Sequence, residues 1–252
     1  MNEKQLKAIR YYEGDVSGDD PFWSDPKAYV TLNSLFFEGI EAERRRAREK
    51  KYLNPEILSD PVRLFTLLKD LLSAFTVSGN ERTTYRVERY DDYLEMKEKG
   101  KTVSFTSTSL DGFLKEYSDR IGITLMVFHI PQEAPVLAFG EVLKEGYLKV
   151  QENEILLPPG LSLELKEIPL EEEDLEIKDA LGDPPIVKCK AYIKEKDTSR
   201  NSDLSSPVCD LKGPQSGIRV YEALNKGREP DLEDVEIYAE WKREFIEKVL
   251  PE

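Results

Sequence analysis

The sequence predicts an α+β protein in which a group of helices precedes a mostly antiparallel sheet. Apolar residues recur at helical spacing over residues 1 to about 78. From about residue 79, short runs of alternating polar and apolar residues are separated by turn residues. Helices that are grouped ahead of a run of strands are typical of the α+β class.

Amphipathic helices are expected within residues 1–78. Tyr29, Leu32 and Phe36 recur at helical spacing. Asp60 followed by Pro61 is typical of a helix start, because an aspartate caps free backbone N–H groups and a proline fits the first turn. These helices need a sheet or one another to cover their apolar faces.

A β-rich core is expected within residues 79–168. Its runs are bounded by turn residues, and Pro158 with Pro159 ends the run that begins at Glu154. The expected strands cover residues 82–88, 102–108, 122–130, 136–139, 154–157 and 161–165.

Residues 169–252 form a C-terminal extension in this interpretation. An acidic stretch, residues 164–182, leads into it and is expected to be a solvated linker. A strand at 186–194 and a polar loop at 197–206 follow. A final helix at about 231–250 places an apolar stripe on one side, formed by Val235, Tyr238, Trp241, Phe245 and Val249.

The composition excludes several classes of function. The 252 residues hold 36 Lys and Arg against 50 Asp and Glu, a net charge of −14, which argues against binding to nucleic acids or anionic membranes. No run approaches the length of a membrane span, and the N-terminus lacks the apolar core of a signal peptide. We therefore expect a soluble protein that is cytoplasmic or exported without a cleaved signal.

The scarcity of histidine and cysteine excludes further chemistry. The sequence holds one histidine, His129, and two cysteines, Cys189 and Cys209, which leaves no zinc framework and no Ser-His-Asp triad. His129 lies in an apolar run and is expected to be a structural histidine. The two cysteines are expected to be reduced, with a disulfide between them as the alternative. Catalysis without a metal must then use carboxylates, hydroxyls and arginines.

Three predicted strands carry such residues. The motifs, which lie in these strands or at their ends, are Tyr85-Arg86, Ser107-Thr108-Ser109 and Glu152-Asn153-Glu154. Singly each motif is common, but in this order and spacing they resemble the Arg-Ser-Glu class of mono-ADP-ribosyltransferases, which includes clostridial binary toxins and vertebrate ecto-enzymes. The resemblance covers residues 1 to about 168. Among the helices it includes the segment Tyr29 to Asn33, which is similar to a segment that precedes the core in this family. It implies a core split into two mainly antiparallel sheets.

The resemblance implies NAD as co-substrate and assigns roles to the three motifs. Breaking the bond between nicotinamide and ribose passes through an oxocarbenium-like state, which a carboxylate stabilises. Glu154 matches the family's catalytic glutamate. Arg86 matches the arginine that binds the cofactor phosphates, and Ser107 matches the serine that positions the glutamate.

Two further positions bear on the acceptor. In this family a glutamate two residues before the catalytic one accompanies modification of arginine, and Glu152 occupies this position. A carboxylate there can pair with a guanidinium and accept its proton. Tyr147 is similar to the aromatic residue of the target-recognition loop, with an aromatic that anchors a hairpin as the alternative.

Three residues complete the predicted cofactor site. Tyr117 and Arg120 are similar to an aromatic–arginine pair that clamps nicotinamide and phosphate in the binary toxins, with a loop tyrosine and a surface arginine as the alternative. Val87 stands where several vertebrate relatives carry glycine, and a backbone contact to nicotinamide survives that change.

The sequence thus predicts an NAD-dependent mono-ADP-ribosyltransferase, a toxin-like effector that releases nicotinamide and modifies arginine in an unidentified protein. An NAD glycohydrolase, in which water replaces the arginine, is the alternative among enzymes. A non-catalytic acidic module that binds a basic partner through the Trp241 helix is the alternative from another class, although such a relative is expected to lack Arg86, Ser107 or Glu154.

Overall fold

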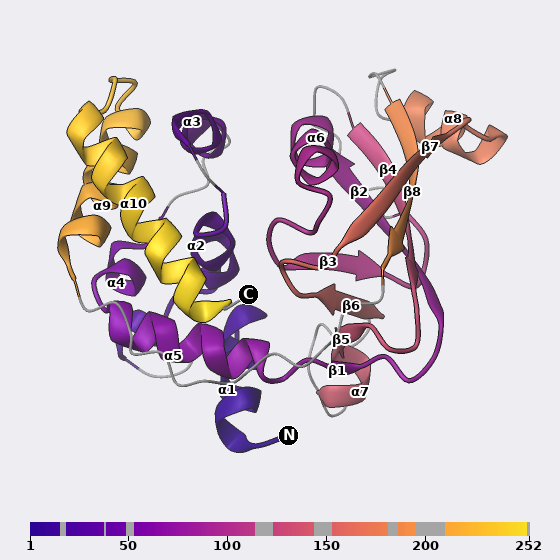
Figure 1. Cartoon of the computed structure of the whole chain (residues 1–252), viewed down its shortest axis with the longest axis horizontal. Coiled ribbons are helices and arrows are strands. Elements are labelled where there is room, and N and C mark those ends of the chain that lie inside the picture. The colour runs from indigo at the N-terminus through magenta and orange to yellow at the C-terminus, as the bar shows by residue number, and fades with distance from the viewer. Residues whose placement is uncertain are drawn as a thin grey trace. The chain divides into compact units, whose positions relative to one another are not determined.

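The computed structural model describes residues 1–15, 19–37, 39–48, 53–113, 123–143, 153–180, 186–194 and 210–250. The chain divides into two compact units, one formed by residues 1–74 with 199–252 and the other by residues 75–198. Figure 1 shows the elements of both units. Within the described ranges, none of the helices combines the length and apolar character that crossing a membrane requires.

The first unit is helical. Asp60 accepts a hydrogen bond from the backbone N–H of Arg63 at 3.0 Å, and Pro61 occupies the first turn, so the helix start predicted at this point is confirmed. The helices of this unit are α1 (Glu3–Tyr12), η1 (Pro21–Trp23), α2 (Ala28–Ser34), α3 (Ile40–Arg48), α4 (Pro55–Leu58), α5 (Pro61–Leu72), α9 (Lys212–Asn225) and α10 (Leu232–Val249).

The C-terminal helices pack within this helical unit. The final helix predicted at 231–250 is confirmed as α10, and its Tyr238, Trp241, Phe245 and Val249 are buried. Phe245 meets Phe65 of α5 edge-on, with ring centroids 6.0 Å apart. The C-terminal end of the sequence therefore contributes to the same core as the first helices.

The second unit is built on a sheet of eight strands in the order β1-β5-β6-β3-β2-β4-β8-β7. Neighbouring strands are antiparallel except β4 and β8, which run parallel, so the predicted mainly antiparallel α+β fold is confirmed. The strands are β1 (Thr76–Val77), β2 (Arg82–Arg89), β3 (Thr106–Ser109), β4 (Ile123–Ile130), β5 (Pro135–Ala138), β6 (Glu154–Leu157), β7 (Leu163–Ile168) and β8 (Ile186–Ile193).

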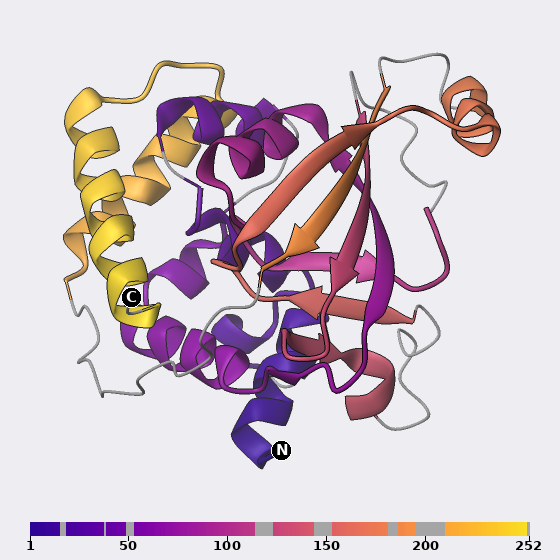
Figure 2. The ribbon, with the colours of Figure 1, turned by 45° about the vertical axis from the view of Figure 1, so that its right-hand side comes forward.

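The sheet has two halves that meet between β2 and β3. β2 pairs with β4 along its whole length, from Arg82 to Arg89. On its other side β2 pairs with β3. Among the described residues, Tyr85 and Ser109 are the only pair of these two strands in register. Figures 1 and 2 show β3 and β6 crossing the strands of the other half at a steep angle. The sheet therefore opens beside Tyr85, as in the split core that the sequence resemblance implies.

The acidic stretch 164–182 differs from its predicted form. It was expected to be a solvated linker, but it forms β7 and the helix α8 (Glu172–Ala180). The ammonium group of Lys188 contacts Asp174 and Glu171 at 2.7 Å each, which compensates part of the negative charge of the stretch. Ile177 packs against the core formed by β2 and β4. Most of the described residues of the stretch are exposed, as its composition indicates, but strand pairing with β8 and the ion pairs of Lys188 give it a regular structure that a linker would lack.

Two more helices belong to the sheet unit. These helices are α6 (Tyr90–Lys99) and α7 (Phe139–Val142). Tyr93 and Met96 of α6 are buried three residues apart on one side of the helix. The phenol of Tyr93 donates a hydrogen bond to Glu167 of β7 at 2.8 Å, which fixes α6 against the sheet.

Candidate active site

Residues of the three predicted motifs lie on three adjacent strands, β6, β3 and β2. In the register of these strands, Glu154 is opposite Ser109, and Ser109 is opposite Tyr85. These three residues therefore form one row across the sheet, with Arg86 next in sequence to Tyr85. The row lies where the two halves of the sheet separate.

Arg86 is held in a fixed orientation at this opening. Its Nε donates to a carboxylate oxygen of Glu88 at 2.5 Å, and its Nη1 donates to the carbonyl oxygen of Ser107 at 2.7 Å. Glu88 is buried and also accepts a hydrogen bond from the backbone N–H of Arg89 at 2.9 Å. The side chain of Arg86 is 27% exposed. The buried carboxylate thus braces a guanidinium that still reaches solvent.

Ser107 and Glu154 lie on the same face of the sheet. Ser107 is opposite Leu156, and Glu154 lies two residues before Leu156 on β6. Side chains at such diagonal positions are about 7–8 Å apart, within reach of a glutamate. Both residues are half-buried, and the three residues after Glu154 are buried. Glu154 therefore stands at the mouth of a buried strand, as the sequence indicates.

Val87 has a structural role through its side chain. It is 4% exposed and packs with Ile123 and Leu125 of β4. A glycine at this position would leave a gap in the core of the sheet unit. Any contact of Val87 with a cofactor must therefore use its backbone.

The positive φ directly before Glu154 does not follow from the predicted elements. Asn153 has a positive φ of 44°, and its side-chain amide donates to both carboxylate oxygens of Asp111 at 3.1 and 3.2 Å. Ser109 accepts a hydrogen bond from the backbone N–H of Asp111 at 3.0 Å. The sequence signal is weak, namely an asparagine, which tolerates positive φ, between two glutamates.

Tyr117, Arg120, Tyr147 and Glu152 lie outside the described residues. Within the helical unit, the segment that shares in the sequence resemblance has a defined arrangement. The amide of Asn33 donates to the Tyr12 hydroxyl at 3.2 Å, and the ring of Tyr29 meets Tyr12 edge-on at 6.3 Å. Helix α2 thus presents a tyrosine and an asparagine one turn apart.

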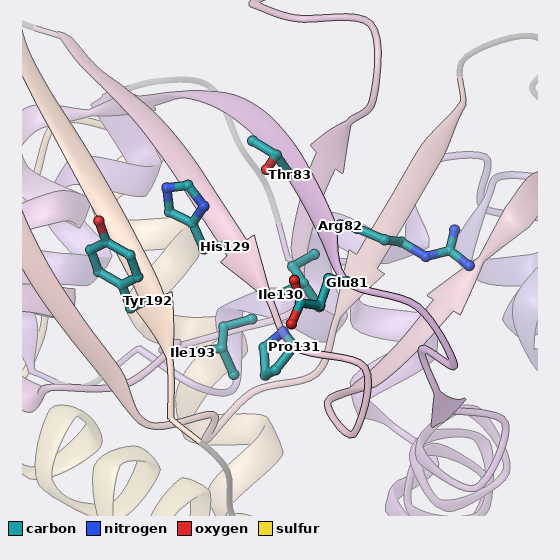
Figure 3. Close-up of a pocket in the computed structure, with 8 residues that line it drawn as sticks. All are labelled: Glu81, Arg82, Thr83, His129, Ile130, Pro131, Tyr192 and Ile193. Carbon is teal, nitrogen blue, oxygen red and sulfur yellow. The ribbon is translucent and has the colours of Figure 1, made fainter.

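A separate pocket of about 440 Å³ lies at the ends of β2, β4 and β8. Figure 3 shows its lining residues, none of which is Arg86, Ser107 or Glu154. His129 stacks on Tyr192 with centroids 4.7 Å apart, whereas Arg82 points away from both rings and pairs with Glu141 at 2.7 Å. Burial lowers the pKa of His129, and the charge of Lys190 lowers it further.

The described residues contain no group of three or more His, Cys, Asp or Glu side chains that could hold a metal ion. Cys189 is a buried free thiol on β8. Burial raises its pKa, which favours the neutral, unreactive form. Cys209 lies outside the described residues.

Comparison with known proteins finds similarity at the level of structure. No protein-family model matches the sequence, and no curated protein matches it. The ADP-ribosylating toxin BECa of a binary enterotoxin of C. perfringens, solved with NADH, is 16% identical, with a TM-score of 0.42 over 77% of this chain and 44% of that chain. The C3 exoenzyme of Clostridium limosum is 12% identical, with a TM-score of 0.43 over 77% of this chain and 87% of that chain.

A third similar structure is C3stau2 from S. aureus, solved with NAD. It is 11% identical, with a TM-score of 0.38 over 78% of this chain and 89% of that chain. The match spans less than half of the BECa chain, and all three TM-scores are low. The likeness by itself therefore assigns neither an activity nor a substrate to this chain.

Proposed function

We propose that this chain is an NAD-dependent mono-ADP-ribosyltransferase. The observation that carries the proposal is the cross-strand row of Glu154, Ser109 and Tyr85, which places Ser107 diagonally from Glu154 on the neighbouring strand, with the guanidinium of Arg86 bonded to the carbonyl oxygen of Ser107. The residues come from sequence positions up to 69 apart, so their convergence is a property of the sheet order.

The residues at and beside this row offer the chemical groups that binding of NAD requires. The planar guanidinium of Arg86 is braced by Glu88 and partly exposed, which suits it to a diphosphate. The opening of the sheet beyond Tyr85 leaves strand edges with backbone groups that can bind the nicotinamide amide. The hydroxyl of Ser107 shares the face of Glu154 and is suited to orient its carboxylate.

The proposed reaction is a substitution at the anomeric carbon of the nicotinamide-bearing ribose. The C–N bond to nicotinamide breaks as the acceptor nitrogen forms a new C–N bond, and nicotinamide leaves with the bonding electrons. The carboxylate of Glu154 stabilises the positive charge that develops on the sugar. Half-burial strengthens this interaction, because fewer waters screen it.

The proposed acceptor is an arginine side chain of another protein. This part rests on Glu152, which precedes Glu154 by two residues in the sequence. Its carboxylate would pair with the acceptor guanidinium and take up the proton that the attacking nitrogen loses. With water as acceptor, the same site would act as an NAD glycohydrolase.

Two substitutions test this proposal. The purified chain is incubated with labelled NAD, with and without agmatine or a cell lysate, and both free nicotinamide and labelled acceptor are measured. Glu154→Gln should abolish transfer and hydrolysis while NAD binding changes only a few-fold, because the carboxylate acts mainly in the transition state and its loss typically costs about 3 kcal/mol or more. Retained turnover would refute the role of Glu154.

Glu152→Gln should separate the two activities. Transfer to agmatine should be lost while slow NAD hydrolysis continues, because the amide cannot accept the guanidinium proton. Parallel loss of both activities would contradict the acceptor role. Hydrolysis without transfer in the unsubstituted chain would favour the glycohydrolase, and the absence of NAD binding would favour the interaction module.

A further inference from the structure

Asn153 has a strained backbone directly before the proposed catalytic residue. It is the one non-glycine residue within the described ranges with a positive φ, 44°. This conformation is unfavourable for L-residues, and asparagine and aspartate tolerate it better than most. β6 begins at the next residue, Glu154, so the strain lies at the point where the strand must enter the sheet.

Two independent connections hold Asn153 to the end of β3. Its side-chain amide donates to both carboxylate oxygens of Asp111, and its carbonyl oxygen accepts a hydrogen bond from the backbone N–H of Leu110 at 3.2 Å. Asp111 is itself fixed, because its N–H donates to the Ser109 hydroxyl. Ser109 is the residue opposite Glu154. These hydrogen bonds therefore connect the residues that follow Ser109 on β3 with the residue that precedes Glu154 on β6, next to the last pair of the β3–β6 ladder.

We propose that Asn153 and Asp111 form a clamp that fixes the direction of the Glu154 carboxylate, which makes both of them positioning residues. Glu154 and Ser109 are the end pair of a ladder of four, and end pairs open most easily. Asn153 and Asp111 are both exposed, so their hydrogen bond adds little to overall stability. Its effect should therefore appear in catalysis more than in folding. This inference rests on the proposed function.

A charge swap tests the clamp. Asn153→Asp keeps a residue that tolerates positive φ but places two carboxylates against each other. Adding Asp111→Asn restores an amide–carboxylate pair with donor and acceptor exchanged and returns the net charge to its original value. Asn80→Asp is the matched control, because Asn80 is an exposed residue just before β2 in the same unit.

Three quantities are measured for each variant: kcat of NAD hydrolysis, KM for NAD, and hydrogen exchange of the Leu110 amide. Asn153→Asp should lower kcat about tenfold with KM within about twofold, because misplacement of a reacting group affects the chemical step. Exchange at Leu110 should accelerate. The double variant should recover both properties, and Asn80→Asp should change neither.

Unchanged kcat and exchange in Asn153→Asp would overturn the clamp, as would a double variant that is as impaired as the single one. An unsubstituted chain that turns over no NAD would instead overturn the proposed function, and with it the catalytic purpose of the clamp. Exchange at Leu110 would still decide whether Asn153 and Asp111 hold the strand end.

Discussion

The guanidinium of Arg86 shows how single residues are adapted to the proposed site. Two of its nitrogens are already bonded, one to the buried Glu88 and one to the carbonyl of Ser107. A lysine at this position would keep the charge but could not make both contacts and also present a planar fork to phosphate. The geometry of the side chain therefore matters as much as its charge.

Arg86→Lys should weaken NAD binding about tenfold, measured by calorimetric titration. Arg82→Lys is the matched control, because it places the same substitution on the same strand at a residue that pairs with Glu141. An unchanged dissociation constant for Arg86→Lys would indicate an ordinary surface arginine.

His129 gives the molecule one side chain whose ordinary pKa, about 6.5, lies near neutral pH. It is the only histidine in the sequence, and its pKa is lowered by burial and by Lys190. The unfolded chain, with an ordinary pKa of about 6.5, then binds a proton more readily than the folded chain. Its contribution to stability is present above that value and is lost as pH falls through the lowered pKa of the folded state.

The free energy of unfolding should therefore decrease as pH falls below about 6.5, before the carboxylates titrate at about 4. Urea titrations at pH 7 and 5.5 measure this difference. His129→Gln should reduce it, because the amide does not titrate. An equal pH dependence in this variant would show that other groups are responsible.

At the scale of elements, the pairing of α9 with α10 depends on two glycines. A Cβ atom on Gly213 would lie 2.2 Å from the Cβ and Cγ atoms of Trp241, and one on Gly217 would lie 2.5 Å from the Tyr238 ring. Both contacts are far shorter than real side chains allow, so the close approach of the two helices requires residues without a side chain.

Gly213→Ala should destabilise the helical unit by about 1–3 kcal/mol through overpacking, although alanine favours helix formation. Denaturant unfolding followed by circular dichroism measures the loss. Gly140→Ala in α7 is the control, because no atom lies within 4 Å of the added Cβ there. Equal stability of the two variants would contradict the close packing of α9 on α10.

At the scale of the whole molecule, a buried ion pair joins segments that are distant in the sequence. Lys242 of α10 donates to Glu43 of α3 at 2.5 Å and to the carbonyl oxygen of Phe37 at 2.6 Å. Both charged side chains are nearly fully buried, at 2% and 4% exposure. Removing one partner leaves an uncompensated buried charge, which is far more costly than losing an exposed pair.

Lys242→Met should therefore lower the free energy of unfolding by about 3–5 kcal/mol, measured by denaturant titration. Combining it with Glu43→Leu should recover much of the loss, because no charge then remains buried. Lys226→Met removes an exposed lysine that pairs with Glu222 and should change stability by less than about 1 kcal/mol. If the double variant were no more stable than Lys242→Met, the ion pair would not explain the loss.

Local patterns in the sequence predicted many of the elements. The strand at 154–157 was predicted with its observed bounds, because an apolar run is ended there by two prolines. Arg86, Ser107 and Glu154 stay predictions as site residues, and they rest on the family resemblance carried by the order and spacing of their motifs. These features depend on neighbouring residues, which the sequence displays directly.

Only the tertiary structure decided which distant segments meet. It placed β8 parallel to β4, ordered the acidic stretch through Lys188, and divided the C-terminal extension between the two units. It also joined Asn153 to Asp111 beside Glu154. Each of these contacts depends on packing and charge pairing between residues far apart in the chain, and such pairings leave no periodic signal in the sequence.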